Sequence, residues 1–177
     1  MEPRTNSLTQ VKDAPATGGE IPGQQLEHFL AARNSLMLAT TDARGTPLAS
    51  YAPCYIEQGS IFVFLSELAP HTDNLLQDNE LSVLLIEDEA QCSNPFRRQR
   101  LSCQGTVIRV ERDSDRWLQK TAQLEKRLGK TMGLLKQLGD FHLFQITPTR
   151  GTFVCGFGKA YRIQGLDGAS LVAIEGR

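Results

Sequence analysis

The residues that could bind a ligand or take part in chemistry lie in two short segments. The first holds His71, Thr72 and Asn74, where a short helix is predicted to begin. The second holds Arg97, Arg98 and Arg100, at the entrance to a predicted strand. Free N–H groups at a helix start bind anions, and guanidinium groups bind carboxylates or phosphates through paired hydrogen bonds. The two segments therefore predict a site for a planar, anionic ligand or cofactor.

Both segments also have purely structural explanations, which the sequence leaves open. The His71–Asn74 segment can be only a helix start that Ser66 or Thr72 caps. The arginines can form a solvated basic patch of little energetic value. Arg100 differs from the other two because it begins the polar face of a regular strand, which gives its side chain a fixed position.

No catalytic set of protein side chains accompanies these segments. The sequence contains no G-x-S-x-G motif and no P-loop. Its cysteines lack the spacing of zinc ligands, and we expect buried, reduced thiols at Cys54, Cys92, Cys103 and Cys155. Any chemistry would therefore be carried by a cofactor, with the protein supplying position and electrostatics.

Composition indicates a single globular domain. The chain has 177 residues, 40% of them hydrophobic, and a net charge of −1. The absence of a basic excess argues against nucleic acid as a partner, and no apolar run reaches the length of a membrane span. No basic-then-apolar leader precedes the domain, so the cytoplasm is the expected location.

Hydrophobic periodicity predicts the order of the elements. A leader over 1–22, expected to be disordered, precedes a split-barrel domain over 23–163 and a flexible tail over 164–177. Helices are predicted over 24–33, 71–77, 115–128 and 131–138. Strands are predicted over 35–42, 48–56, 61–66, 81–87 and 100–111, with a loop over 88–98 and a last hairpin of 141–147 and 152–163 joined by 148–151.

This order predicts a mainly β protein with helices, in the α+β class. Strand meanders interrupted by helical excursions are typical of a small closed antiparallel barrel whose ends are covered by helices. Closure removes the unpaired strand edges that would otherwise aggregate.

The chain resembles the pyridoxamine-phosphate-oxidase-like split-barrel superfamily in its opening hairpin, residues 38–47. Four further segments resemble the haem-utilisation branch of the HugZ/HutZ type: 68–75, 96–101, 139–144 and 156–161. The resemblance implies a six-stranded antiparallel split barrel that forms a homodimer. It also implies haem, or in sibling branches FMN, bound in the clefts between the subunits.

The resemblance also assigns roles to particular residues. Arg100 matches an arginine near the haem pocket, and Asp140 matches an acidic residue that reaches from the partner subunit toward the axial ligand. A turn would equally explain an aspartate at this helix-to-strand junction. The axial ligand itself is not identified, because the branch takes it from a C-terminal segment and His142 is the last histidine here. Alternation makes His142 a weak candidate, since it points away from Phe141 and Leu143.

Three functions remain open at this point. The first is a haem-binding protein of haem-iron utilisation, with or without oxidative opening of the haem ring. The second is an FMN-binding oxidoreductase in which Thr72 and the arginines take the flavin phosphate. The third is a store or carrier of haem that catalyses nothing.

Overall fold

The computed structural model describes residues 21–175. Its helices are α1 (Pro22–Ala31), α2 (Pro70–Gln77), α3 (Asp115–Leu128) and α4 (Thr131–Leu135), with two 3₁₀ turns, η1 (Glu89–Gln91) and η2 (Pro95–Arg97). Its strands are β1 (Ser35–Thr41), β2 (Pro47–Glu57), β3 (Ser60–Ser66), β4 (Glu80–Ile86), β5 (Arg100–Val110), β6 (Phe141–Gly156), β7 (Lys159–Gln164) and β8 (Val172–Ala173).

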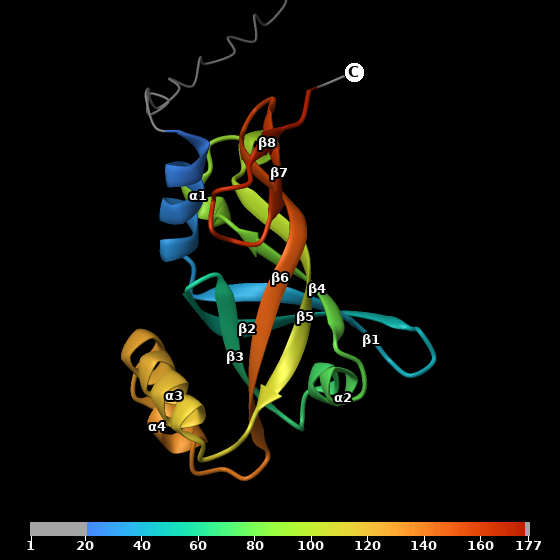
Figure 1. The fold of residues 1–177 in the computed structure, drawn as a ribbon, viewed down its shortest axis with the longest axis vertical. Helices are drawn as coiled ribbons and strands as arrows, with labels where there is room; N and C mark the ends of the chain where they lie inside the picture. Colours follow the sequence, from blue (N-terminus) through green and yellow to red (C-terminus); the bar gives the residue numbers. More distant parts are fainter. Residues whose placement is uncertain (1–20, 176–177) are drawn as a thin grey trace, which may run out of the picture.

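Six of the strands close into an antiparallel barrel, as predicted. Their order is β3-β2-β1-β4-β5-β6, and pairing of β3 with β6 completes the ring. Two tight turns set the register of the first three strands. Asp42 accepts hydrogen bonds from the N–H groups of Arg44 and Thr46, and Gln58 and Gly59 take the positive φ angles of a two-residue hairpin turn. Figure 1 shows the ring with α2 and the α3–α4 pair beside its lower end.

The prediction of the last hairpin, with its turn at 148–151, is wrong. Residues 148–151 are not a turn but part of β6, which runs unbroken for 16 residues. The register against β5 shifts between Gln104 and Gly105, which places a bulge at Pro148–Arg150. Proline has no N–H to donate to the ladder and is tolerated in a sheet at such bulges. The chain reverses at Gly156–Lys159 instead, where Gly158 has a φ of 69°.

Two glycines allow β5 and β6 to cross closely at this bulge. A Cβ on Gly105 would lie 2.7 Å from the carbonyl oxygen of Thr147, and a Cβ on Gly151 would lie 2.6 Å from the Cβ of Cys103. Real side chains do not approach so closely, so neither position accepts a larger residue without a shift of backbone. The first half of β6 closes the barrel, and the second half carries the β7–β8 ribbon.

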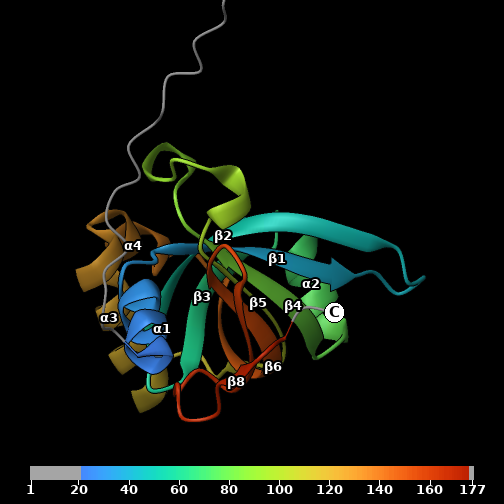
Figure 2. The same cartoon turned by 90° about the horizontal axis from the view of Figure 1, so that it is seen from above.

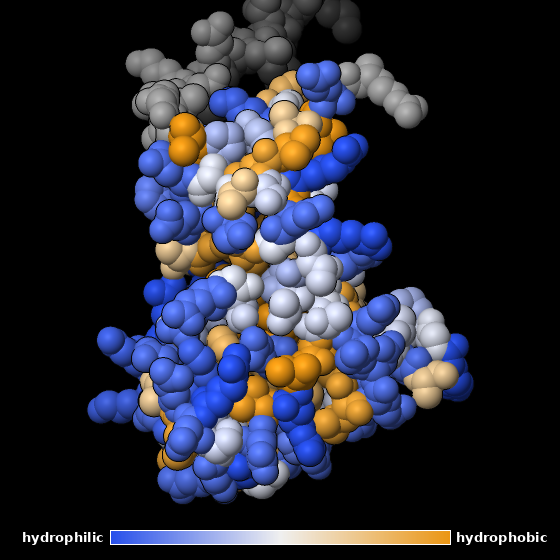
Figure 3. Space-filling view, in the orientation of Figure 1, coloured by the Kyte–Doolittle hydropathy of each residue, from blue (hydrophilic) through white to orange (hydrophobic). Residues whose placement is uncertain are grey.

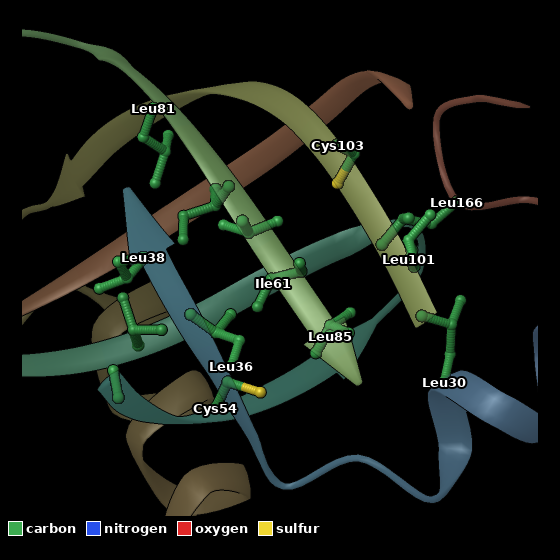
Figure 4. Packing of buried hydrophobic residues seen from close by; sticks show 14 of the residues in the cluster. Leu30, Leu36, Leu38, Cys54, Ile61, Leu81, Leu85, Leu101, Cys103 and Leu166 are labelled. Atoms are coloured by element: carbon green, nitrogen blue, oxygen red, sulfur yellow. The ribbon is translucent and has the colours of Figure 1, made fainter. Parts of the chain in front are cut away.

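The barrel interior is the main core. Alternate residues of the strands point inward, and on β5 this alternation buries Leu101, Cys103, Gly105 and Val107. Figure 4 shows the packing of these strands with Leu30 of α1 and Leu166. A second, smaller core lies under α3, where Trp117 and Leu124 pack on Phe62, Phe64 and Leu143.

Helix α3 has the predicted range, whereas α4 is shorter than predicted. Ser114 is the N-cap and its hydroxyl accepts the N–H of Trp117. Leu118 of the same helix is 52% exposed. Helix α4 ends at Leu135, three residues before the predicted end, and only turn-type hydrogen bonds continue to Leu138.

The first helix and the last ribbon lie against each other. Phe29 of α1 packs on Phe153 of β6 with ring centroids 5.5 Å apart. A Cβ on Gly168 would lie 3.5 Å from the Cα of Gly23. Figure 2 shows the segment after β7 beside α1, and the η1–η2 segment standing out from the barrel. Leu166, beyond β7, is buried in the main core.

The surface carries isolated apolar side chains. In Figure 3 hydrophobic colour gathers near the β7–β8 ribbon and on the lower half of the molecule. The largest exposed fractions belong to Leu68, Phe96, Phe157 and Leu134. Within residues 21–175 no helix combines the length and apolarity needed to cross a bilayer.

Candidate functional site

The residues predicted at the start of α2 are buried, and each is hydrogen-bonded to a residue of a barrel strand. His71 Nδ1 lies 2.9 Å from Ser50 Oγ of β2, and Asn74 donates to Thr40 Oγ1 of β1 at 2.9 Å. Thr72 is fully buried, and its hydroxyl donates to the carbonyl oxygen of Ser66 at 2.6 Å. These bonds dock α2 on the barrel.

The alternative prediction, a cap by Ser66 or Thr72, is wrong. The N-cap of α2 is Ala69, and no side chain caps it. Pro70 fits the first helical turn because its missing N–H would have had no partner there. The Ser66 hydroxyl instead accepts the N–H of Leu68 at 3.1 Å, before the helix begins.

Asp140 lies next to this helix start, although 74 residues separate it from Ser66. The Ser66 hydroxyl donates to Asp140 Oδ2 at 2.7 Å, and the N–H of Glu67 donates to the Asp140 carbonyl oxygen at 2.9 Å. Thr72 and Asp140 are therefore both bound to Ser66. We call Ser66, Glu67, Thr72, Asp140 and His142 the β3-end cluster.

His142 completes this cluster at the mouth of the barrel. Its Nε2 lies 2.6 Å from Glu67 Oε1, and its ring meets the buried ring of Phe144 edge-on at 6.2 Å. It points away from Phe141 and Leu143, which pack in the second core. An imidazole held by a carboxylate has one ring nitrogen oriented and the other left for a further partner.

The arginines lie at a different place, where β4 ends and β5 begins. Arg98 Nε donates to the carbonyl oxygen of Glu87 at 2.7 Å, and its NH1 pairs with Glu89 at 3.4 Å. Arg100 NH1 donates to the carbonyl oxygen of Arg98 at 2.9 Å. In the described part of the chain, no carboxylate pairs with Arg100. Most of its N–H groups therefore remain for an anionic ligand.

The sequence prediction missed a further arginine at this corner. Arg33, just after α1, donates NH1 to the carbonyl oxygen of Ile86 at 2.8 Å and stacks over Phe29. Arg33 and Arg98 both line a hollow of about 360 Å³, together with Met37 and Ile86. Arg33 precedes a strand by two residues and carries no local motif, so only the folded chain places it there. We call Arg33, Arg98 and Arg100 the arginine corner.

The two groups of predicted residues do not meet within one chain. Arg100 pairs with Val154 at one end of the β5–β6 ladder, whereas Val110 pairs with Leu143 at the other end, close to Asp140. At about 3.3 Å per residue, Arg100 and the β3-end cluster lie roughly 30 Å apart along β5. A site that contains both Arg100 and Asp140 must therefore combine two subunits.

Burial sets the charge of several groups near the barrel. It lowers the pKa of His71 below 6.5, so this imidazole is neutral at pH 7. It raises the pKa of Cys54 and of Cys103 to about 12, which keeps both as thiols. All four cysteines are free, with Cys54 and Cys103 buried as predicted and Cys92 and Cys155 only half-buried.

Comparison with known proteins gives a consistent picture. A family model described as pyridoxamine 5'-phosphate oxidase matches residues 23–155. The chain is 40% identical over 166 residues to haem oxygenase HutZ of Vibrio cholerae, covering 94% of this chain and 93% of that protein.

Solved structures resemble it as well. A crystal structure of HutZ from Vibrio cholerae, described as a haem storage protein, has a TM-score of 0.70 and 38% identity, covering 81% of this chain and 96% of that one. The structure of ChuZ from Campylobacter jejuni has a TM-score of 0.78 and 28% identity, covering 86% of this chain and 61% of that one.

Proposed function

The chain belongs to the pyridoxamine 5'-phosphate oxidase family, in its HugZ/HutZ-type branch, and on that premise we propose that it binds haem for haem-iron utilisation. The observation that carries the proposal is the geometry of Arg100. Its half-buried guanidinium begins a regular strand, has one backbone partner and has no carboxylate partner among residues 21–175. Such a group binds a carboxylate well, because its donors are already oriented.

The arginine corner fits the chemistry of haem. Haem carries two propionates on an apolar, planar ring. Arg98 and Arg100 offer N–H groups, and the hollow beside Arg98 presents apolar surface from Met37 and Ile86 together with the acidic residues Glu87 and Asp88. When bound, haem supplies redox-active iron and the porphyrin that an oxygenase opens. The protein's part is to bind the propionates and to exclude water from the ring.

Asp140 has a separate part in the proposed site. Its Oδ2 is bound by Ser66, whereas its Oδ1 has no partner in the described residues and is not a buried atom. This oxygen could accept a hydrogen bond from an imidazole or water that binds the haem at the partner subunit's site. A carboxylate in that place orients the ligand and raises its donor strength. We therefore propose a homodimer in which each site takes Arg100 from one subunit and Asp140 from the other.

One observation favours FMN as the second candidate. Helix α2 begins without a side-chain cap, so its first N–H groups are not bound by a side chain. A flavin phosphate binds well at such a helix start. The burial of His71 and Thr72 limits access to it, however, and the HutZ proteins to which the chain is similar in sequence are described by their haem.

Titration of the full chain with haem and with FMN tests these alternatives. We expect a Soret band that saturates at one haem per subunit, and no uptake of flavin. The Arg100→Ala variant should bind haem more weakly, whereas Arg44→Ala should bind as the wild type does. Arg44 is a matched control because its side chain is 88% exposed in the β1–β2 turn. Binding of FMN in place of haem would contradict the proposal.

The same protein then separates an oxygenase from a store. Ascorbate and oxygen are added to the haem complex, and the Soret band and chelatable iron are followed. Loss of the band with release of iron indicates ring opening. An unchanged spectrum indicates storage or transport. The two descriptions of HutZ, as an oxygenase and as a storage protein, differ on this same point.

A further inference from the structure

Ser66 lies between the start of α2 and Asp140 of the proposed site. It is the last residue of β3 and pairs with Phe141 across the ladder that closes the barrel. Its carbonyl oxygen accepts the Thr72 hydroxyl and the N–H of Ala69. Its side chain faces Asp140. The backbone of Ser66 therefore binds the start of α2, and its side chain binds Asp140.

The hydrogen bonds of the Ser66 hydroxyl have a fixed direction. A serine hydroxyl has one proton and can accept through its lone pairs. The N–H of Leu68 donates to Oγ at 3.1 Å, and Oγ lies 2.7 Å from Asp140 Oδ2. Because a carboxylate can only accept, the single proton of Ser66 points to Asp140. The Leu68 N–H holds the hydroxyl in that orientation.

The Asp140 residue is thereby held at two points. Ser66 binds one carboxylate oxygen, and the N–H of Glu67 binds the backbone carbonyl. Both donors come from the end of β3, so the orientation of the carboxylate follows from the closure of the barrel. With Oδ2 occupied, Oδ1 is the oxygen that remains for another partner.

We propose that Ser66 is a positioning residue: its hydroxyl fixes the Asp140 carboxylate so that Oδ1 faces the ligand of the partner subunit. This inference rests on the proposed function, since it assigns Ser66 a role only through Asp140. It adds a residue that neither the sequence motifs nor the comparisons assign to the site.

The first test uses the protein without haem. Three-bond NMR couplings report the χ1 rotamer of Asp140 in the wild type and in Ser66→Ala, Ser66→Thr and Thr72→Val. We expect one rotamer in the wild type and in Ser66→Thr, which keeps a hydroxyl, and rotamer averaging in Ser66→Ala. Thr72→Val is the matched control, because it removes a hydrogen bond from the Ser66 carbonyl but not from its hydroxyl. A single rotamer in a folded Ser66→Ala variant overturns the proposal.

The second test uses the haem complex. Ser66→Ala should change the Soret and electron paramagnetic resonance spectra in the same direction as Asp140→Asn, with haem affinity within about threefold of the wild type. The double variant Ser66→Ala/Asp140→Asn should show no further spectral change than Asp140→Asn alone, because the effects of two substitutions that remove the same contact do not add. Additive spectral changes, or an effect of Asp140→Asn with none of Ser66→Ala, overturn the proposal. If the wild type does not bind haem, the proposed function fails while the rotamer test still decides whether Ser66 orients Asp140.

Discussion

Arg100 and Asp140 lie at opposite ends of the β5–β6 ladder and cannot meet in one chain. Each is supported by its own local contacts, a backbone carbonyl for Arg100 and the Ser66 hydroxyl for Asp140. If both serve one ligand, they do so across a subunit boundary. Because of this separation, variants of Arg100 and Asp140 can test whether the protein forms the proposed dimer.

Mixing two defective variants tests this arrangement. When Arg100→Ala and Asp140→Asn subunits are unfolded together and refolded, half of the dimers should be mixed, and each mixed dimer should hold one intact site. About a quarter of all sites should then show the wild-type haem spectrum, if the subunits pair at random and the site is shared. Refolding of each variant alone is the control. No intact sites in the mixture would contradict a site that takes Arg100 from one subunit and Asp140 from the other.

The charge and shape of Arg100 should both matter for haem affinity. Arg100→Ala should raise the Kd for haem about 10- to 100-fold, the loss expected of a charge-assisted hydrogen bond of about 1.5–3 kcal/mol. Arg100→Lys keeps the charge but loses the planar fork, so it should recover only part of the affinity. Soret titration measures both. Equal affinity of the lysine variant and the wild type would show that charge alone is required.

The stability of the protein should fall below neutral pH partly because of His71. Burial lowers the pKa of His71 in the folded chain below its unfolded value of 6.5. The unfolded chain therefore binds the proton first, and the free energy of unfolding falls as the pH drops from 6.5 to the folded pKa. Urea unfolding between pH 7.5 and 5 should show a smaller loss for His71→Asn than for the wild type. His28→Asn, at an exposed position of α1, is the matched control.

The crossing of β5 and β6 should not tolerate a methyl group. Gly151→Ala places a Cβ against Cys103 and the Ser102 carbonyl, and we expect a loss of about 1–3 kcal/mol from overpacking. Gly139→Ala is the control, because a Cβ there meets nothing within 4 Å, and its effect should stay within about 0.5 kcal/mol. Chemical denaturation measures both. Equal stability of the two variants would contradict the close approach of the strands.

Thiol labelling should distinguish the cysteines. At pH 8 the native protein should react with a thiol reagent first at Cys92, which is half-buried in the loop after η1. Cys54 and Cys103, with pKa values of about 12, should react only after unfolding, because the thiolate is the reactive form. Mass spectrometry of the labelled peptides identifies the sites. Labelling of Cys54 in the native state would contradict its burial.

Much of the fold could be predicted because the local signals agree with the tertiary structure. The predicted strands over 35–42 and 100–111 and the predicted helix over 115–128 all match the structure, because strand alternation and the Ser114 cap support them locally. The final hairpin could not be predicted, since Pro148 and Gly151 are turn signals and bulge signals alike. Only pairing with β5, which lies far away in the sequence, decides between them.

The candidate site was less predictable for the same reason. The segment with His71, Thr72 and Asn74 was found from its residue types, but its partners Ser50 and Thr40 come from other strands. The contact of Ser66 with Asp140 spans 74 residues and has no motif. Arg33 belongs to the arginine corner only because the fold places the end of α1 beside the end of β4, where Arg33 binds the carbonyl oxygen of Ile86. The type of each residue is read directly from the sequence, whereas its hydrogen-bond partners are set by the folded chain.

The contact of Gly23 with Gly168 brings the first helix against the segment after β7, so two elements that are far apart in the sequence adjoin in space. When an early and a late element adjoin in this way, a fold can accept circular permutation that joins them and reopens the chain in an exposed turn. The turn at Asp42–Gly45 is such a place, because its hydrogen bonds are local. The order of the elements along this chain is therefore less constrained than their arrangement in space.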